Sequence, residues 1–273
     1  MNPHPVPPLC LSFGPADPTG AGGVQADLLT AAALRGHMLT VLTAWLVQDS
    51  AALESVKPLA PEAVDDQARG LLEDMTVSAF KVGALYRPEI VSVVAQIVAD
   101  YPAVPLVLHL GAESRPTTEP GSDDGDEAVV QASLDLLVPQ ATLVVVDHAR
   151  LERWFQDGWL AADGADTALQ ALLALQTGQV LVTGVPHQEA PVNVLAGAGP
   201  QAEAWSWRRL PLAYLGAGST LTAALATLLA RQVPLRQAVI DAQQFTRHAL
   251  EAGYRPGMGR CFPDRQYWRG TTI

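Results

Sequence analysis

Short apolar segments alternate along most of this chain with segments whose apolar residues recur at helical spacing. The apolar segments predict buried strands at residues 9–14, 38–47, 78–82, 105–110, 142–146 and 179–183. The helical spacing predicts helices between them at residues 24–35, 61–74, 88–100 and 163–176. Repeated strand–helix units are typical of a largely parallel sheet with helices on both faces, so we expect an α/β protein.

The last third of the chain has a different pattern. Residues 191–195 and 204–209 predict a hairpin around the glycine-containing segment 196–200. Two long apolar helices are then expected at residues 219–231 and 235–252. Because no internal repeat or second domain is visible, residues 1–273 are predicted to form a single domain, with an extended N-terminal tail at residues 1–8.

One segment interrupts the alternation. Residues 113–127 contain six carboxylates and one arginine, a composition that cannot bury apolar area. We therefore expect a flexible acidic surface loop. A flap over a binding site is the functional alternative, since lids often occupy such positions, but the composition favours a solvated loop.

Charge and cysteine content narrow the class of protein. The net charge of −11 argues against a nucleic-acid surface, which normally carries a basic patch. The two cysteines, Cys10 and Cys261, match no zinc spacing. The N-terminal residues lack the features of a secretory signal, and no apolar run reaches membrane-spanning length. These features predict a cytoplasmic protein without nucleic-acid or membrane partners.

Two glycine-rich turns lie near opposite ends of the chain. The first spans residues 14–27, and the second, Gly-Ala-Gly-Ser-Thr at residues 216–220, opens an apolar helix. Glycine lets a backbone approach a ligand closely, and the free N–H groups of a helix N-terminus attract anions. Together the two turns predict a small-molecule site and a phosphate site.

Several candidate residues follow the predicted strands. In open α/β sheets, ligands bind beyond the carboxyl ends of the strands. The positions that fall there are Gly14, Gln48, Gly83, His109, Asp147 and Gly184.

The first glycine-rich turn also resembles a known family signature. Asp17-Pro18, Gly20, Gly23, Gln25-Ala-Asp27 and Thr30 match the N-terminal signature of the hydroxymethylpyrimidine and phosphomethylpyrimidine kinases of thiamine biosynthesis. The similarity continues at residues 42–48, 81–83, 137–143 and 216–225, and so spans nearly the whole chain. This family belongs to the ribokinase-like superfamily. The resemblance implies a three-layer α/β/α fold with a mostly parallel central sheet.

The resemblance also implies an activity and a set of residues. It implies ATP-dependent phosphorylation of 4-amino-5-hydroxymethyl-2-methylpyrimidine or its monophosphate, with ATP and Mg²⁺ as cofactors, by a homo-oligomer. The implied catalytic residues are Ser219, Gly216, Ala217 and Gly218. The implied substrate-binding residues are Gly14, Asp27, Gln48, Ala84 and His109. The implied nucleotide-binding residues are Asp147, Thr183 and Gly184. We assign no metal ligand, although Asp147 takes the place of a metal-facing asparagine.

Several positions on the phosphate side depart from the family. Arg150 replaces a glutamate, the segment 183–186 lacks a phosphate-facing lysine, and Ser219 stands where related kinases carry an aspartate base or a cysteine. A serine hydroxyl is not a base near neutral pH without a neighbour that takes its proton. It can still donate a hydrogen bond to an anion. Arg150, His109 and His148 are candidates to compensate.

Two alternatives to the pyrimidine kinase therefore remain open. The first is a catalytically impaired pyrimidine-binding protein, a sensor or carrier, which the altered phosphate side favours. The second is a kinase for another ring alcohol such as pyridoxal. The pyrimidine kinase is preferred because the anion-binding turn and its helix are retained.

Overall fold

A single nine-stranded sheet organises the molecule in the computed structural model, which describes residues 6–111, 122–197, 199, 201–207 and 210–267. The strand order is β3-β2-β1-β4-β5-β6-β7-β8-β9. The strands are β1 (Leu9–Ala16), β2 (His37–Gln48), β3 (Leu53–Pro58), β4 (Ala79–Val82), β5 (Leu106–Leu110), β6 (Leu143–Asp147), β7 (Gln179–Val185), β8 (Val192–Gly197) and β9 (Glu203–Ser206). Strands β1, β2 and β4 to β7 pair in parallel, whereas β3, β8 and β9 pair antiparallel toward the two edges.

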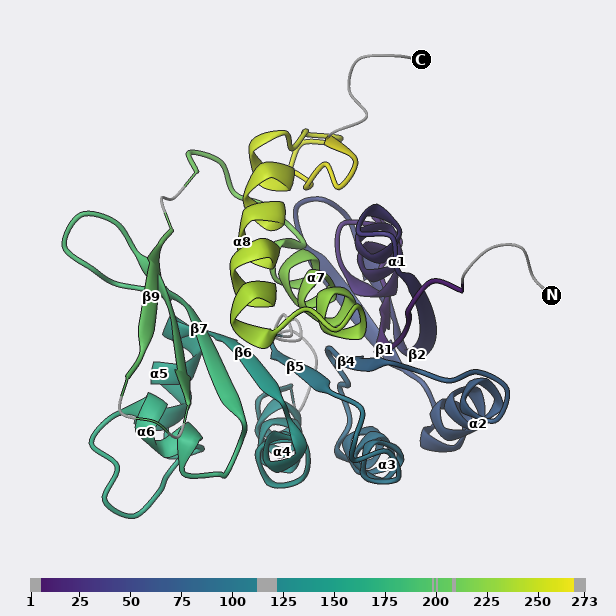
Figure 1. Cartoon of the computed structure of the whole chain (residues 1–273), viewed down its shortest axis with the longest axis horizontal. Helices are drawn as coiled ribbons and strands as arrows, with labels where there is room; N and C mark the ends of the chain where they lie inside the picture. The colour runs from purple at the N-terminus through teal and green to yellow at the C-terminus, as the bar shows by residue number, and fades with distance from the viewer. Residues whose placement is uncertain (1–5, 112–121, 198, 200, 208–209, 268–273) are drawn as a thin grey trace.

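Helices cover both faces of this sheet. Helices α1, α7 and α8 lie on one face and α2 to α6 on the other, which makes three layers (Figure 1). The helices are α1 (Gly23–Ala33), α2 (Pro61–Leu72), α3 (Pro88–Ala99), α4 (Ser122–Leu136), α5 (His148–Gln156), α6 (Ala168–Leu173), α7 (Ala217–Ala230) and α8 (Leu235–Glu251), with a short 3-10 helix at Val138–Gln140.

The core lies on both sides of the sheet, and strand β6 shows why. Leu143 and Val145 pack in the cluster under α7 and α8, whereas Val144 and Val146 pack in the cluster under the opposite helices. Successive side chains of a strand point to opposite faces, so a strand buried on both faces is apolar at every position. This is why the central strands appear in the sequence as continuous apolar runs.

The structure contains all six predicted strands and all six predicted helices, with shifted ends. The hairpin at the end of the sheet is also confirmed, as β8 and β9. The helix expected at residues 163–176 is limited to Ala168–Leu173. Thr167 caps its start and forms a reciprocal capping box with Gln170.

Four elements were not predicted: β3, α4, α5 and the short 3-10 helix. Helix α4 corrects the expectation of a loop over residues 113–127, because it begins at Ser122 and extends to Leu136. Its second half packs Val129, Val130 and Ala132 against the core, which stabilises a helix whose start is highly acidic. Residues 112–121 of the predicted loop, like residues 1–5 of the predicted tail, lie outside the described residues.

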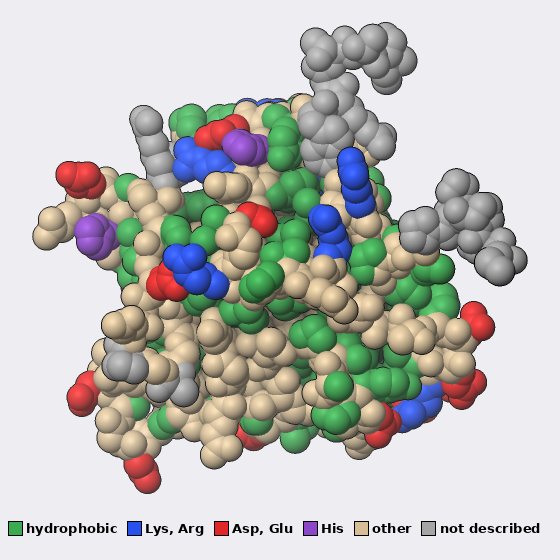
Figure 2. All heavy atoms as spheres, viewed as in Figure 1, with side chains coloured by type: hydrophobic (Ala, Val, Ile, Leu, Met, Phe, Trp, Pro, Cys, Tyr) green, Lys and Arg blue, Asp and Glu red, His purple; other side chains and the backbone are tan. Residues whose placement is uncertain are grey.

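Charged side chains are scattered over one face of the molecule (Figure 2). On the face in Figure 2, the lysine and arginine side chains lie in small groups, several of them beside aspartate or glutamate, and do not form a continuous basic stripe. Within the described part of the chain, no helix combines the length and apolar character that a bilayer crossing requires.

Candidate functional site

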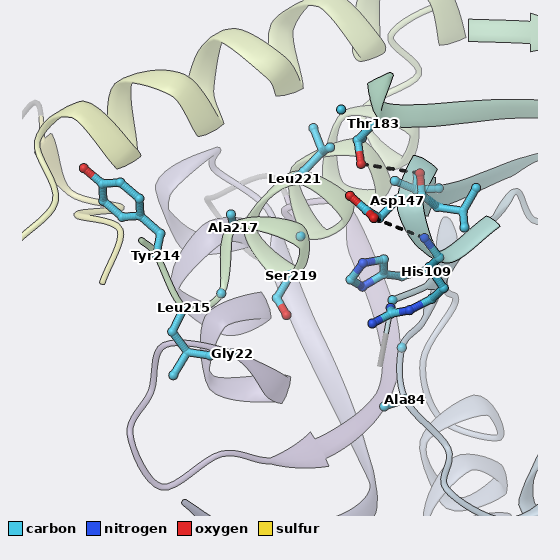
Figure 3. A pocket seen from close by; sticks show the side chains of 18 of the residues that line it. Gly22, Ala84, His109, Asp147, Thr183, Tyr214, Leu215, Ala217, Ser219 and Leu221 are labelled. Carbon is cyan, nitrogen blue, oxygen red and sulfur yellow. Dashed lines mark hydrogen bonds between the residues drawn. The ribbon is translucent and has the colours of Figure 1, made fainter. Parts of the chain in front are cut away.

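A cavity of about 760 Å³ lies at the carboxyl ends of the parallel strands. Its volume is typical of small-molecule sites. Its walls come from the ends of β2, β4, β5, β6 and β7 and from the start of α7. Figure 3 shows Ser219 and Ala217 on one side of the cavity and His109 and Asp147 on the other. The predicted site residues that line it are Gln48, Ala84, His109, Asp147, Thr183, Gly184, Gly216, Ala217, Gly218 and Ser219.

Two predicted substrate-binding residues, Gly14 and Asp27, are not among the lining residues. Strand β1 continues beyond Gly14 to Ala16, so Pro15 and Asp17 reach the cavity instead. Asp27 is fully buried, and its Oδ2 accepts hydrogen bonds from Ser12 Oγ at 2.6 Å and Lys81 Nζ at 2.8 Å.

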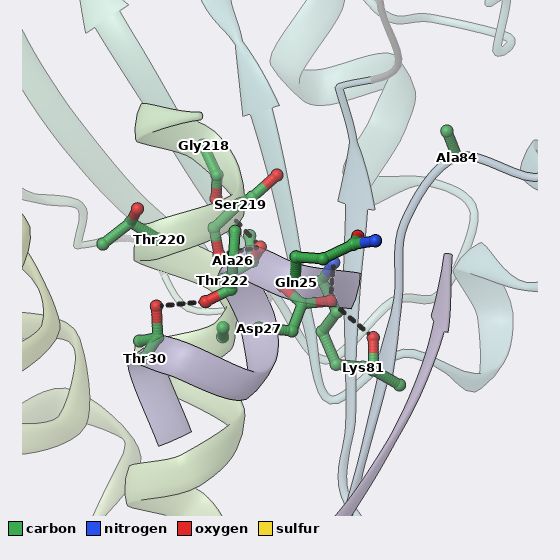
Figure 4. A network of polar contacts seen from close by, with 12 residues as sticks. Gln25, Ala26, Asp27, Thr30, Lys81, Ala84, Gly218, Ser219, Thr220 and Thr222 are labelled. Atoms are coloured by element: carbon green, nitrogen blue, oxygen red, sulfur yellow. Dashed lines mark hydrogen bonds and ion pairs between the residues drawn. The ribbon is translucent and has the colours of Figure 1, made fainter. Parts of the chain in front are cut away.

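The Asp27–Lys81 ion pair gives the Asp27 carboxylate a charged partner within the protein. Lys81 extends from β4 to Asp27 on α1 (Figure 4), and its side chain is 2% exposed. A charge buried to this extent requires a partner. Asp27 neutralises Lys81 beneath the cavity floor, which Lys81 helps to form. The predicted contact between the Asp27 carboxylate and a substrate is not supported by this geometry.

The first glycine-rich turn folds around the Asp17 carboxylate. Asp17 Oδ1 accepts from the backbone N and Oγ1 of Thr19, each at 2.8 Å, and Oδ2 accepts from Gly22 N at 2.7 Å. Gly23 has a φ of +58°, and a Cβ atom there would overlap the carbonyl oxygen of Pro15. The spacing of Asp17 and these glycines thus shapes a backbone loop whose Gly22 and Gly23 face the cavity.

The second glycine-rich turn places the N-terminus of α7 in the cavity wall. Gly216 precedes the helix with a φ of +86°, in the left-handed region that favours glycine. The N–H groups of the first helical turn have no partner within the helix. They carry a partial positive charge and are suited to an anion. Ser219 adds a hydroxyl to the same wall.

His109, on β5, lies close to this second glycine-rich turn. A Cβ atom on Gly218 would lie 2.7 Å from His109 Nε2, and a Cβ atom on Gly111 would overlap the same ring. Burial, together with the positive charges of Lys81 and Arg150, lowers the pKa of His109 to about 3. The imidazole is therefore neutral near neutral pH and offers one donor and one acceptor.

This neutral histidine makes a testable contribution to stability. The pKa of His109 is about 3 in the folded protein against an ordinary 6.5, so the unfolded chain binds the extra proton between these values. Its stabilising effect is complete above about pH 6.5 and is lost as the pH falls toward 3. As the pH falls toward 3, we expect the free energy of unfolding of His109→Gln to decrease by roughly 2–4 kcal/mol less than that of wild type.

Urea denaturation at several pH values measures this slope. His187→Gln is the control, because His187 is exposed. Equal acid slopes for wild type and His109→Gln would show that His109 titrates normally in the fold.

Asp147 borders the cavity at the end that the resemblance assigns to the nucleotide. This residue ends β6 and caps α5, because its Oδ1 accepts from Ala149 N at 3.0 Å and from Arg150 N at 3.3 Å. Its Oδ2 faces Gly184, 3.6 Å from where a Cβ on that residue would lie. Arg150 also lines the cavity, and its Nη1 approaches Leu110 O at 3.5 Å. One carboxylate and one guanidinium therefore border this end.

Gly184 is held by a residue that sequence reasoning missed. It has a φ of +74°, and its N–H donates to Asn193 Oδ1 at 3.0 Å. Asn193 Nδ2 donates in turn to Gln243 Oε1 at 2.8 Å, which links β7 through β8 to α8. Asn193 also lines the cavity. Nothing in the local sequence around Asn193 signals this role, since its partners lie 9 and 50 residues away.

The chain is similar to known proteins over nearly its whole length. Residues 17–263 match the family model described as phosphomethylpyrimidine kinase. A hydroxymethylpyrimidine/phosphomethylpyrimidine kinase of Streptomyces coelicolor is 30% identical over 268 residues, covering 94% of each chain.

Solved structures confirm the expected ribokinase-like three-layer fold. The pyridoxal kinase of Bacillus subtilis in complex with ADP has a TM-score of 0.82 at 22% identity and covers 97% of this chain and 99% of that one. A phosphomethylpyrimidine kinase from Clostridium difficile has a TM-score of 0.70 at 21% identity, with 89% and 99% covered.

Proposed function

This chain belongs to the phosphomethylpyrimidine kinase family, and we propose that it transfers the γ-phosphoryl group of ATP to a pyrimidine. The acceptor is 4-amino-5-hydroxymethyl-2-methylpyrimidine or its monophosphate, in thiamine biosynthesis. The observation that carries the proposal is that one cavity has polar strand ends on one side and the N-terminus of α7 on the other. Phosphoryl transfer depends mainly on such positioning and on charge stabilisation.

The acceptor is proposed to bind at the end bordered by Gln48, Ala84 and His109. The Gln48 amide has both donors and an acceptor, which suits the edge of an aminopyrimidine. Neutral His109 adds one donor or acceptor without a charge. Ala84 is small, and it leaves room beside them.

ATP is proposed to bind at the other end, against Asp147, Thr183 and Gly184. Its γ-phosphate then meets the amides of residues 216–219, where backbone donors stabilise developing charge. Arg150 supplies a fixed positive charge from the first turn of α5. Because cellular ATP is a cytoplasmic substrate, we propose the same compartment for this protein. The homo-oligomer implied by the resemblance stays a prediction.

Mg²⁺ fits the donors present at this end. Mg²⁺ keeps several waters and is held by one or two carboxylates together with substrate phosphates. The carboxylate of Asp147 would hold it, since only Oδ1 is engaged by the start of α5. When bound, the ion neutralises charge on the β- and γ-phosphates.

Ser219→Asp is expected to raise pyrimidine phosphorylation by about tenfold or more, since a general base contributes roughly 10²–10⁴-fold. The α7 N-terminus favours the added negative charge, which offsets part of its repulsion from phosphate. Initial rates at saturating ATP measure the effect. Ser219→Asn is the matched control, because it has nearly the same shape and no basic oxygen. Equal rates for the two variants would show that transfer is not limited by a missing base.

A pyrimidine-binding protein without turnover is the second candidate. The segment 183–186, Thr-Gly-Val-Pro, favours it because no lysine is available there to contact a phosphate. Calorimetric titration with the pyrimidine, and separately with ATP and Mg²⁺, distinguishes the two functions. Tight pyrimidine binding without ATP binding selects the second candidate, whereas binding of both supports the kinase. Pyridoxal titrated in parallel tests the remaining alternative, a kinase for another ring alcohol.

A further inference from the structure

The C-terminal strap, residues 257–265, connects separate walls of the cavity. Near its start, Gly259 N donates to Ser50 Oγ at 3.1 Å and Arg260 N to Ser50 O at 2.8 Å, beside the end of β2. Further on, Cys261 N donates to Ala213 O at 2.8 Å and Cys261 O accepts from Leu215 N at 2.9 Å. The strap thus runs from the acceptor end of the cavity to the entrance of the second glycine-rich turn.

Arg265, the last residue of the strap, contacts both glycine-rich turns. Its Nε donates to Thr220 Oγ1 at 3.0 Å, in the first turns of α7. Its Nη1 donates to Gly20 O at 3.3 Å, and its Nη2 donates to Ala21 O. The residue is only 4% exposed. Burial lowers its pKa to about 10, while Asp27 and Asp17 favour the charged form, so it remains a cation near neutral pH.

The two turns meet where Arg265 joins them. A Cβ atom on Gly216 would overlap the carbonyl oxygen of Ala21, so the two backbones are in direct contact. Ala21, Leu215 and Phe262 form a small apolar cluster beside this contact. Both turns also present backbone to the cavity, through Gly22 and Gly23 on one side and residues 216–219 on the other.

We propose that Arg265 is a positioning residue for phosphoryl transfer, which fixes the first glycine-rich turn against the start of α7. This inference rests on the proposed function. The planar guanidinium has donors at fixed angles, so it can hold two carbonyl groups and one hydroxyl in a single arrangement. Small displacements of groups that position a substrate cost large factors in rate. Arg265 acts through these backbones and does not line the cavity itself.

The test compares Arg265→Gln, Arg265→Lys and Arg265→Ala with wild type. Steady-state kinetics are normalised to the folded fraction measured by circular dichroism. For Arg265→Gln we expect kcat to fall by about tenfold or more while the KM for the pyrimidine stays within about threefold. We expect an intermediate kcat for Arg265→Lys, because an ammonium keeps the charge but lacks the planar set of donors of the guanidinium. Arg255→Gln is the control, since Arg255 is exposed.

Chemical rescue separates positioning from folding. Millimolar guanidinium should raise the kcat of Arg265→Ala and not that of wild type, whereas sodium chloride at equal ionic strength should raise neither. Guanidinium weakens folding in general, so a gain in activity means that the ion has replaced the missing side chain. The proposal is overturned if guanidinium gives no rescue, or if kcat per folded molecule of Arg265→Gln stays near the wild-type value.

Measuring the affinity for ADP tests the role of Arg265 without requiring that the acceptor be known. ADP binding to Arg265→Gln should be weaker than to wild type by about fivefold or more, because the α7 amides are displaced. If wild type binds ADP but phosphorylates no pyrimidine, the proposed function fails and ADP affinity alone decides the role of Arg265. Equal ADP affinities would then overturn that role.

Discussion

Asp27→Ala is expected to lower the free energy of unfolding by about 3–5 kcal/mol, because it leaves Lys81 buried without its partner. This differs from the loss of affinity that a ligand-binding carboxylate would show. Urea denaturation followed by circular dichroism gives the stability. Asp66→Ala is the matched control, since Asp66 is exposed on α2 and should change stability by about 0.5 kcal/mol or less.

A double variant shows whether the effect comes from the ion pair. Asp27→Leu combined with Lys81→Met replaces both charges with apolar groups, and we expect it to be more stable than Asp27→Ala. If Asp27→Ala keeps the stability of wild type but binds the pyrimidine more weakly, the original prediction of a ligand contact is correct and the burial argument is wrong.

Gly216→Ala is expected to reduce phosphoryl transfer by about a hundredfold or more, since removing one oxyanion-type donor alone costs 10²–10³ in rate. Alanine disfavours the left-handed φ of +86°, and its Cβ would overlap the carbonyl oxygen of Ala21. The start of α7 must therefore move away from the first turn. Single-turnover kinetics with saturating ATP measure the change.

Gly70→Ala provides the matched control for this substitution. Gly70 lies in α2, and a Cβ there would have nothing within 4 Å. Alanine in a helix interior is favoured over glycine, so this variant should be slightly more stable than wild type and fully active. Wild-type turnover by Gly216→Ala would show that the second glycine-rich turn tolerates displacement.

The sheet and the site's general position were predictable because both depend on local patterns. Doubly buried strands such as β6 are apolar at every position, and strand–helix alternation sets the parallel order. The carboxyl ends of parallel strands meet at one edge, so His109, Asp147 and Gly184 were expected together and do line one cavity.

The remaining features depend on partners distant in sequence. Strand β3 is a short edge strand with several polar residues. The acidic start of α4 does not indicate a helix, because the contacts with the core that stabilise it come from its second half. Asp27 was assigned to the ligand because burial against Lys81, 54 residues away, is not visible in its motif. Arg265 joins residues 45 and 244 positions away, which no local pattern indicates.

The most direct measurement is transfer of labelled γ-phosphate from ATP to 4-amino-5-hydroxymethyl-2-methylpyrimidine and to its monophosphate, with products separated by chromatography. We predict a labelled pyrimidine phosphate that requires ATP and decreases in Gly216→Ala. Pyrimidine bound in the cavity with no labelled product, at enzyme concentrations above those of both substrates, would contradict the proposed kinase activity.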